Sequence, residues 1–216
     1  QLRRWEYLHG KRLDSNLLVR VRGMGPDMRA EIRWRFLERQ IPHRGNCIIS
    51  AENLFWLDDE AQIAALATRL KERFDDISVV AYLRRQDALA LSHRKQVVMG
   101  RPAYLFYGAQ VQALPTLKPH MHRYFDYADK LAMWESAFGA EHVVVRRYQK
   151  KDLVGGDTVL DFWNLIGLPA PEEQRVRVNT ALSRDQLLAG LWLRQRHYPK
   201  YAIVEPLGQI QDTEQL

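Results

Sequence analysis

Arg84 and Ser92 are the side chains whose types and spacing most clearly suggest chemistry. They lie in residues 76–96, whose first half is a short apolar run rich in β-branched and aromatic residues. Such a run is typical of a strand buried on both faces, as in a parallel sheet, and a segment with helical spacing follows from Gln86. Ligands of open α/β sheets collect beyond the carboxyl ends of the strands, so Arg84 is expected at the mouth of the sheet. Ser92 would lie about two helical turns along, and a guanidinium with a hydroxyl there suits a phosphate.

The same two residues also have an ordinary structural interpretation. An arginine at a strand end can form a salt bridge at the start of the next helix, and a helical serine can simply face solvent. Arg85 either assists Arg84 or points to solvent. The functional interpretation therefore depends on what surrounds this element.

Apolar periodicity predicts the elements that would position the site. The clearest helix lies at 58–74 and connects two runs typical of buried strands, 46–50 and 76–83. This unit is βαβ, with a right-handed crossover expected. The apolar face of the helix comprises Ile63, Leu66, Ala67, Leu70 and Phe74. A third run of the strand type, 142–148, again contains arginines near its end.

The remaining segments complete a single α/β domain over residues 1–216. We expect helices at 27–40, 87–99, 126–138, 157–166 and from 183 onward, the last with a Ser183–Gln186 capping pair. Residues 1–10 suggest a short helix, 17–21 a strand or a helix end, and 101–122 a long surface excursion beside the site. The predicted fold has three layers, with a central, mostly parallel sheet flanked by helices.

Composition and charge restrict the class of protein. The chain has 216 residues, 46% of them apolar and 27% charged, which is typical of a soluble globular protein. No stretch approaches the roughly 20 apolar residues of a membrane span, and the N-terminus has no signal-peptide pattern. Cys47 is the one cysteine, so a Cys-cluster zinc site is excluded and we expect a cytoplasmic location and no metal. The net charge of +6 favours anionic partners, but the basic residues are scattered, which argues against nucleic acid.

Four blocks in order resemble the bacterial, carbohydrate-directed sulfotransferases, which use 3′-phosphoadenosine-5′-phosphosulfate as sulfuryl donor. These blocks are 48–54, 82–96, 146–169 and 178–183. The resemblance implies a fold like that of P-loop nucleotide-binding proteins, with the nucleotide as co-substrate. It implies that Arg84 and Ser92 bind the 3′-phosphate of the donor, and it places Glu52 at the tip of the neighbouring strand as first candidate for the catalytic base.

One part of the family pattern is missing from the sequence. The family begins with a strand and a phosphate loop, Lys-x-Gly-Thr-Thr or similar, which binds the 5′-phosphosulfate at a helix N-terminus. Neither Gly23-Met24-Gly25-Pro26 nor any other segment matches that loop. Either the strand and loop lie upstream of Gln1, which we favour, or the protein is a relative that lacks part of the donor site.

Several histidines compete with Glu52 for the role of base. His93, His120 and His122 are the alternatives, and Glu52 itself could instead be an N-cap or salt-bridge residue. His120 and His122 have a metal-like spacing, but without a third ligand they are better explained as exposed loop residues.

The leading hypothesis is a sulfotransferase acting on a hydroxyl of a carbohydrate or glycolipid. The alternative is a non-catalytic basic module that binds nucleic acid or another anionic polymer on the same scaffold. A nucleotide kinase is disfavoured, because no Gly-rich loop with Lys-Ser/Thr occurs.

Overall fold

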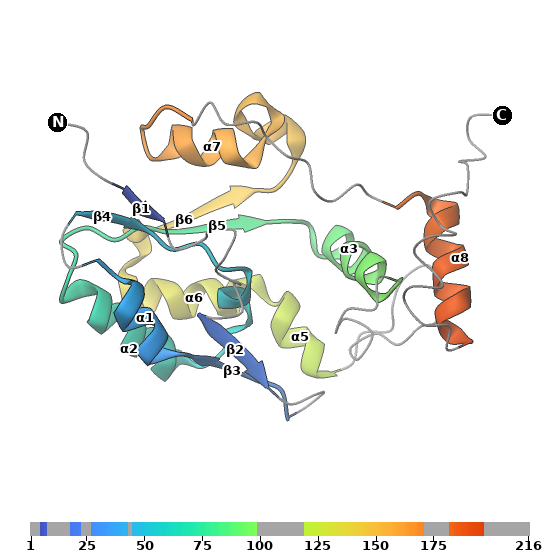
Figure 1. Ribbon diagram of the computed structural model, residues 1–216, viewed down its shortest axis with the longest axis horizontal. Coiled ribbons are helices and arrows are strands. Elements are labelled where there is room, and N and C mark those ends of the chain that lie inside the picture. Colours follow the sequence, from blue (N-terminus) through green and yellow to red (C-terminus); the bar gives the residue numbers. More distant parts are fainter. Residues whose placement is uncertain are drawn as a thin grey trace. The chain divides into compact units, whose positions relative to one another are not determined.

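The chain combines helices with short strands, so the coarse α/β class is confirmed (Figure 1). The computed structural model describes residues 5–7, 18–22, 27–42, 45–98, 119–170 and 182–196. Across these ranges the strands form three two-stranded sheets, β1–β4, β2–β3 and β5–β6, and not one central sheet. The described helices are too short or too polar to cross a membrane.

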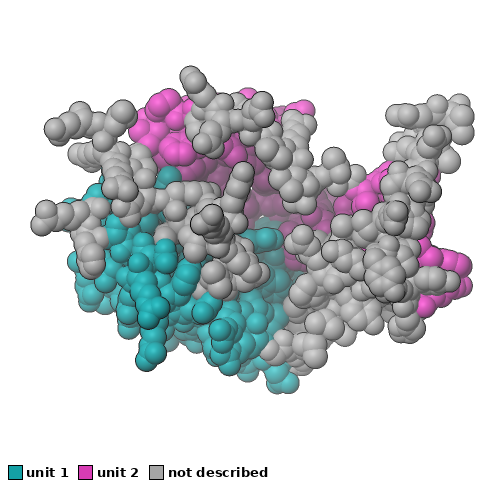
Figure 2. Space-filling view, viewed as in Figure 1, with its two compact units in different colours: residues 1–81, 119–145 teal, residues 82–118, 146–216 magenta. Residues whose placement is uncertain are grey.

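The chain divides into two compact units (Figure 2). The first comprises residues 1–81 and 119–145, and the second residues 82–118 and 146–216. Each unit is therefore built from two separate stretches of chain. The single domain expected from the sequence stays a prediction.

The first unit contains a short parallel pair of strands. β1 (Trp5–Tyr7) pairs with β4 (Asn46–Ile48), with Glu6 opposite Cys47. The strand expected at 46–50 is thus confirmed, whereas the short helix suggested for 1–10 is wrong at 5–7. Aromatic residues favour strands, and the hydrogen bonds that decide the conformation come from a partner some 40 residues away in the sequence.

A β-hairpin replaces the first part of the helix expected at 27–40. β2 (Val19–Arg22) pairs antiparallel with β3 (Arg29–Ile32), and helix α1 spans only Trp34–Gln40. Burial in β3 alternates from exposed to buried along the strand, with Ala30 and Ile32 inward. The apolar residues of 28–37 fit a helical face as well, but pairing with β2 determines the outcome. The strand alternative for 17–21 is confirmed at 19–21.

Helix α2 (Glu60–Lys71) matches the sequence prediction closely. Asp59 is its N-cap and accepts hydrogen bonds from the backbone N–H groups of Ala61 and Gln62. Its predicted apolar face is buried, with Phe74 half-buried beyond its end. Gln62 also bonds to the backbone of β3, through Ile32 N at 3.1 Å and Ala30 O at 3.0 Å. One side chain thereby satisfies polar groups on the edge of β3 that faces away from β2.

Helices α5 (Pro119–Phe125) and α6 (Tyr127–Phe138) complete the first unit. The helix predicted at 126–138 is confirmed as α6. Asp126 caps it, and it ends at Gly139, whose φ of 101° suits glycine. Helix α6 packs against α2. The excursion expected at 101–122 lies outside the described residues up to 118, and its last part is helical, not loop.

The second unit carries helices α3 (Gln86–Val98), α7 (Thr158–Leu165) and α8 (Arg184–Gln195). All three were predicted, and α3 packs against α8. Ser183 and Gln186 form the expected reciprocal cap, with bonds of 2.9 and 3.2 Å. The predicted block at 178–183 lies outside the described residues up to 181.

Strands β5 (Val79–Leu83) and β6 (Val143–Arg147) pair with each other, and their arrows point the same way (Figure 1). Both strands were predicted. The residues of β5 are half-buried, not fully buried as the apolar run suggested. β6 is its hydrogen-bonded neighbour among the described strands, so the sheet is narrower than the run implied.

Candidate functional site

Arg84 lies where the sequence placed it, directly after β5 and two residues before α3. Its side chain is half-buried, and its guanidinium carbon is 4.5 Å from the centre of the Tyr148 ring. The backbone N–H of Tyr148 donates a 2.8 Å hydrogen bond to the carbonyl of Leu83. The segment after β6 therefore contacts Arg84 through its ring and the residue before Arg84 through its backbone.

A buried carboxylate lies next to these strand ends. Asp161, on α7, is fully buried, and its Oδ2 atom accepts hydrogen bonds from Tyr82 Oη and Arg146 Nε, both at 2.9 Å. Its Oδ1 atom accepts from Arg146 Nη2 at 2.5 Å and from the backbone N–H of Val154 at 3.1 Å. The Asp161 cluster, formed by these four residues, thus joins β5, β6 and the segment before α7.

The ionisation of the cluster follows from its hydrogen bonds. The bonds from Arg146 are the main reason why the pKa of Asp161 falls to about 2, against the opposing effect of burial. Burial, followed by the bond to Asp161, raises the pKa of Tyr82 to about 12. Asp161 is therefore ionised and Tyr82 neutral near pH 7. The cluster holds structure at that pH and does not exchange protons.

Helix α3 carries Ser92 and two buried polar side chains. Ser92 is half-buried, whereas His93 and Arg94 are 7% and 1% exposed. Burial, with a smaller effect of the Arg84 charge, lowers the pKa of His93 to about 4. His93 is thus neutral at physiological pH, and it lies near enough to Arg84 to feel its field. Burial also lowers the pKa of Arg94.

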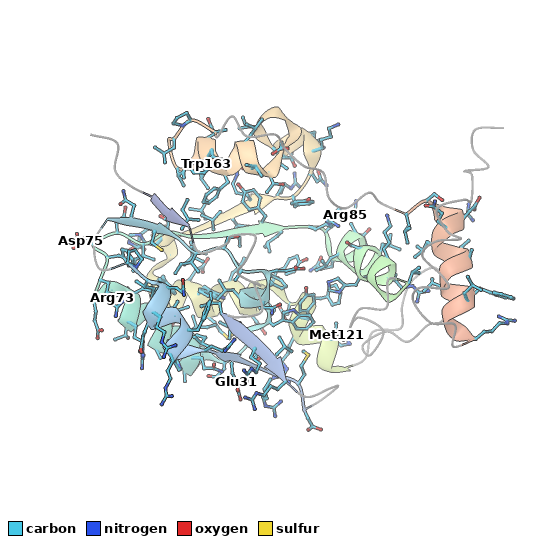
Figure 3. All side chains as sticks on the ribbon, viewed as in Figure 1. Glu31, Arg73, Asp75, Arg85, Met121 and Trp163 are labelled. Atoms are coloured by element: carbon cyan, nitrogen blue, oxygen red, sulfur yellow. The ribbon has the colours of Figure 1, made fainter. Side chains whose placement is uncertain are left out.

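The second arginine of the strand end has a different environment. Arg85 forms two bonds to Asp87, from Nε at 3.1 Å and from Nη2 at 2.7 Å, and its side chain is 72% exposed (Figure 3). The salt bridge at a helix start that the sequence allowed for this region is thus made by Arg85. The alternative that Arg85 points to solvent is confirmed.

Glu52 belongs to the first unit and is exposed. It begins a 3₁₀ helix, η3 (Glu52–Trp56), whose N-cap is Ala51. The side chain of Asn53 donates to the carbonyl of Val19 at 3.2 Å, and Lys130 Nζ donates to the carbonyl of Phe55 at 3.0 Å. These two hydrogen bonds attach the turn that carries Glu52 to β2 and to α6. Of the two structural roles considered for Glu52, that of N-cap is wrong.

The other histidines considered for catalysis lie on α5. His120 and His122 are helical, which corrects their assignment to a loop, and His122 is exposed. Among the described residues, no three His, Cys, Asp or Glu side chains are grouped as metal ligands would be.

Among the described residues, three buried charged side chains escaped the sequence analysis: Arg94, Lys130 and Asp161. Lys130 is 6% exposed, and its Nζ lies 5.1 Å from the ring centre of Phe55 and 5.9 Å from that of Tyr124. Burial lowers the pKa of this amine. Its position four residues before Trp134, on the apolar face of α6, was a signal that could have identified it.

Comparisons with known proteins give one partial match and no family. No family model matches the chain, and no solved structure matches it. An Archaeoglobus fulgidus protein described as uncharacterized is 33% identical over 107 residues. The match covers 49% of this chain and 27% of the archaeal protein, so this chain spans well under two thirds of that relative.

The Asp161 cluster leads to a prediction about stability. Asp161→Asn should lower the free energy of unfolding by about 3 kcal/mol, because Arg146 would lose its ionised partner and the buried amide nitrogen of asparagine would meet N–H or O–H donors. Urea unfolding at pH 7 measures the loss. Asp157→Asn is the matched control, since asparagine caps α7 about as well as aspartate. A similar, small effect of both substitutions would contradict the anchoring role.

His93 leads to a prediction about pH. Its pKa is about 4 in the folded chain against an ordinary 6.5, so the unfolded chain binds more protons between these values. The free energy of unfolding therefore falls by about 3 kcal/mol as the pH drops from 6.5 to 4. Well above pH 6.5, His93 is neutral in both states and its effect on stability no longer changes with pH. His93→Gln should remove that slope in urea unfolding at pH 7, 5.5 and 4.5. The exposed His122→Gln should keep it, and an unchanged slope in His93→Gln would refute the prediction.

Proposed function

We propose that this protein is a sulfotransferase that moves a sulfuryl group from 3′-phosphoadenosine-5′-phosphosulfate to a hydroxyl of a carbohydrate or glycolipid. One observation carries the proposal. Arg84 directly follows β5, contacts the ring of Tyr148, and lies two residues before the helix that carries Ser92. This is the strand–arginine–helix–serine arrangement that the family resemblance requires for a 3′-phosphate site.

The chemistry of these groups suits a phosphate dianion. A guanidinium can donate two parallel hydrogen bonds to phosphate oxygens, and a serine hydroxyl can donate a third. His93, neutral and next to Ser92, adds no competing positive or negative charge near pH 7. Together these groups would position the nucleotide and would not contact the sulfur.

Glu52 is the proposed base for the transfer step. The acceptor hydroxyl oxygen would form a bond to sulfur while the bond from sulfur to the phosphate oxygen breaks, and Glu52 would take the hydroxyl proton. Adenosine 3′,5′-bisphosphate would leave as the second product. Because Glu52 is exposed in the chain alone, a bound acceptor would have to shield it from water when it acts as the base.

The finer description of the fold belongs to the same proposal. We include in it a three-layer arrangement with one central, mostly parallel sheet. The parallel pairing of β1 with β4 and the helices that follow β4 and β5 support this arrangement. On this view the donor is a co-substrate, no metal takes part, and the protein acts in the cytoplasm.

A comparison of Arg84 with Arg85 tests the donor site. Arg84→Ala should weaken binding of adenosine 3′,5′-bisphosphate about tenfold or more, since charge-assisted bonds to phosphate are lost. Arg85→Ala should change it less than about twofold, because Arg85 is exposed and already pairs with Asp87. Calorimetric titration at one fixed salt concentration gives both affinities. Equal affinities for the two variants would remove Arg84 from the site.

Glu52→Gln tests the role of the base. We expect turnover to fall by about 10² or more while binding of adenosine 3′,5′-bisphosphate is retained, because only proton removal is affected. Release of the bisphosphate from the donor, in the presence of a panel of oligosaccharides, measures turnover. Glu60→Gln, an exposed acid in the first turn of α2, is the control. Unchanged turnover in Glu52→Gln would assign the base elsewhere.

A second candidate function rests on the exposed face of the β2–β3 hairpin. Arg20, Arg22, Arg29 and Glu31 share this face, and Arg22 lies directly opposite Arg29. Like charges opposite each other destabilise a sheet, and the one acid on this face, Glu31, forms an ion pair with Arg22 and lies opposite Arg20 in the register. A non-catalytic module that binds nucleic acid or another anionic polymer would use such a face. Polymer binding that weakens with salt and is unaffected by Arg84→Ala, without any transfer, would favour this function.

A further inference from the structure

We propose that Tyr148 is a positioning residue for Arg84 and so contributes to recognition of the 3′-phosphate of the nucleotide. This inference rests on the proposed function and adds a residue from the segment after β6 to the same site. It concerns only the second unit, which contains both side chains.

The contact between the two side chains has the geometry of a cation–π interaction. The guanidinium carbon of Arg84 is 4.5 Å from the ring centre of Tyr148, within the roughly 6 Å over which such attraction acts. A ring on the face of a guanidinium occupies none of its five N–H groups, which all lie in the plane. Tyr148 can therefore restrict Arg84 without competing with a phosphate for hydrogen bonds.

The backbone gives Tyr148 a fixed place beside Arg84. Its N–H donates at 2.8 Å to the carbonyl of Leu83, the residue just before Arg84. Two residues before Tyr148, Arg146 is held by Asp161 through two hydrogen bonds. The segment that carries the ring is thus attached to β5 through Leu83 and to α7 through the Arg146–Asp161 pair.

Positioning of this kind reduces the cost of binding. A free arginine side chain loses rotamer freedom when it grips a ligand, and a side chain already held loses less. Because the ring of Tyr148 is 39% exposed, its replacement leaves little unfilled core volume. A substitution there should thus alter the site more than the fold.

The test compares two nucleotides that differ in the 3′-phosphate, adenosine 3′,5′-bisphosphate and adenosine 5′-monophosphate. In calorimetric titrations, Tyr148→Leu should weaken the bisphosphate about three- to tenfold and leave the monophosphate unchanged. Tyr148→Phe keeps the ring and should stay within about twofold of wild type for both. Tyr148→Gln is a second variant without the ring, should the leucine variant not fold.

A double-mutant cycle separates positioning from a general structural effect. When Arg84 is already alanine, Tyr148→Leu should cause no further loss of bisphosphate affinity. An equal loss in that background, an equal loss for both nucleotides, or no loss at all would overturn the positioning role. A wild-type protein that binds the bisphosphate no better than the monophosphate would overturn the proposed donor site itself, and the inference with it.

Discussion

The buried carboxylate of Asp161 is the constraint on which the candidate site depends. A fully buried negative charge is costly unless donors surround it, and here the donors come from three segments, one of which lies 79 residues from Asp161 in the sequence. Tyr82 at β5, Arg146 at β6 and Val154 before α7 must all converge on one side chain. Asp161 thus fixes how the ends of the two strands lie against the start of α7.

The proposed site residues lie two positions beyond the anchoring residues. Arg84 comes two residues after Tyr82, and Tyr148 comes two residues after Arg146. The bond between Tyr148 N and Leu83 O extends the pairing of the strands to this level. The bonds from Asp161 to Tyr82 and Arg146 therefore also restrict where Arg84 and Tyr148 can lie.

Local patterns in the sequence were sufficient for the elements whose cause is local. The apolar face of α2 and the Ser183–Gln186 cap follow from periodicity and short-range hydrogen bonds, and both appear in the structure. β1 and β3 were missed because a three- or four-residue strand is determined by its partner. Asp161 was missed for the same reason: an acid in the first turn of a helix usually faces solvent, favoured by the helix dipole, and its phenolic donor is 79 residues away.

Carboxylates pair with three of the arginines around the strand ends. Arg85, Arg146 and Arg147 each face a carboxylate, of Asp87, Asp161 and Asp152 respectively. A neighbouring carboxylate cancels most of the field that a distant anion would feel, so these arginines contribute little to attraction. Arg84 packs against the ring of Tyr148, and a ring on the face of a guanidinium takes none of the N–H groups that lie in its plane. The proposed phosphate site therefore rests on this contact and on the helix that carries Ser92, more than on the number of basic residues near the strand ends.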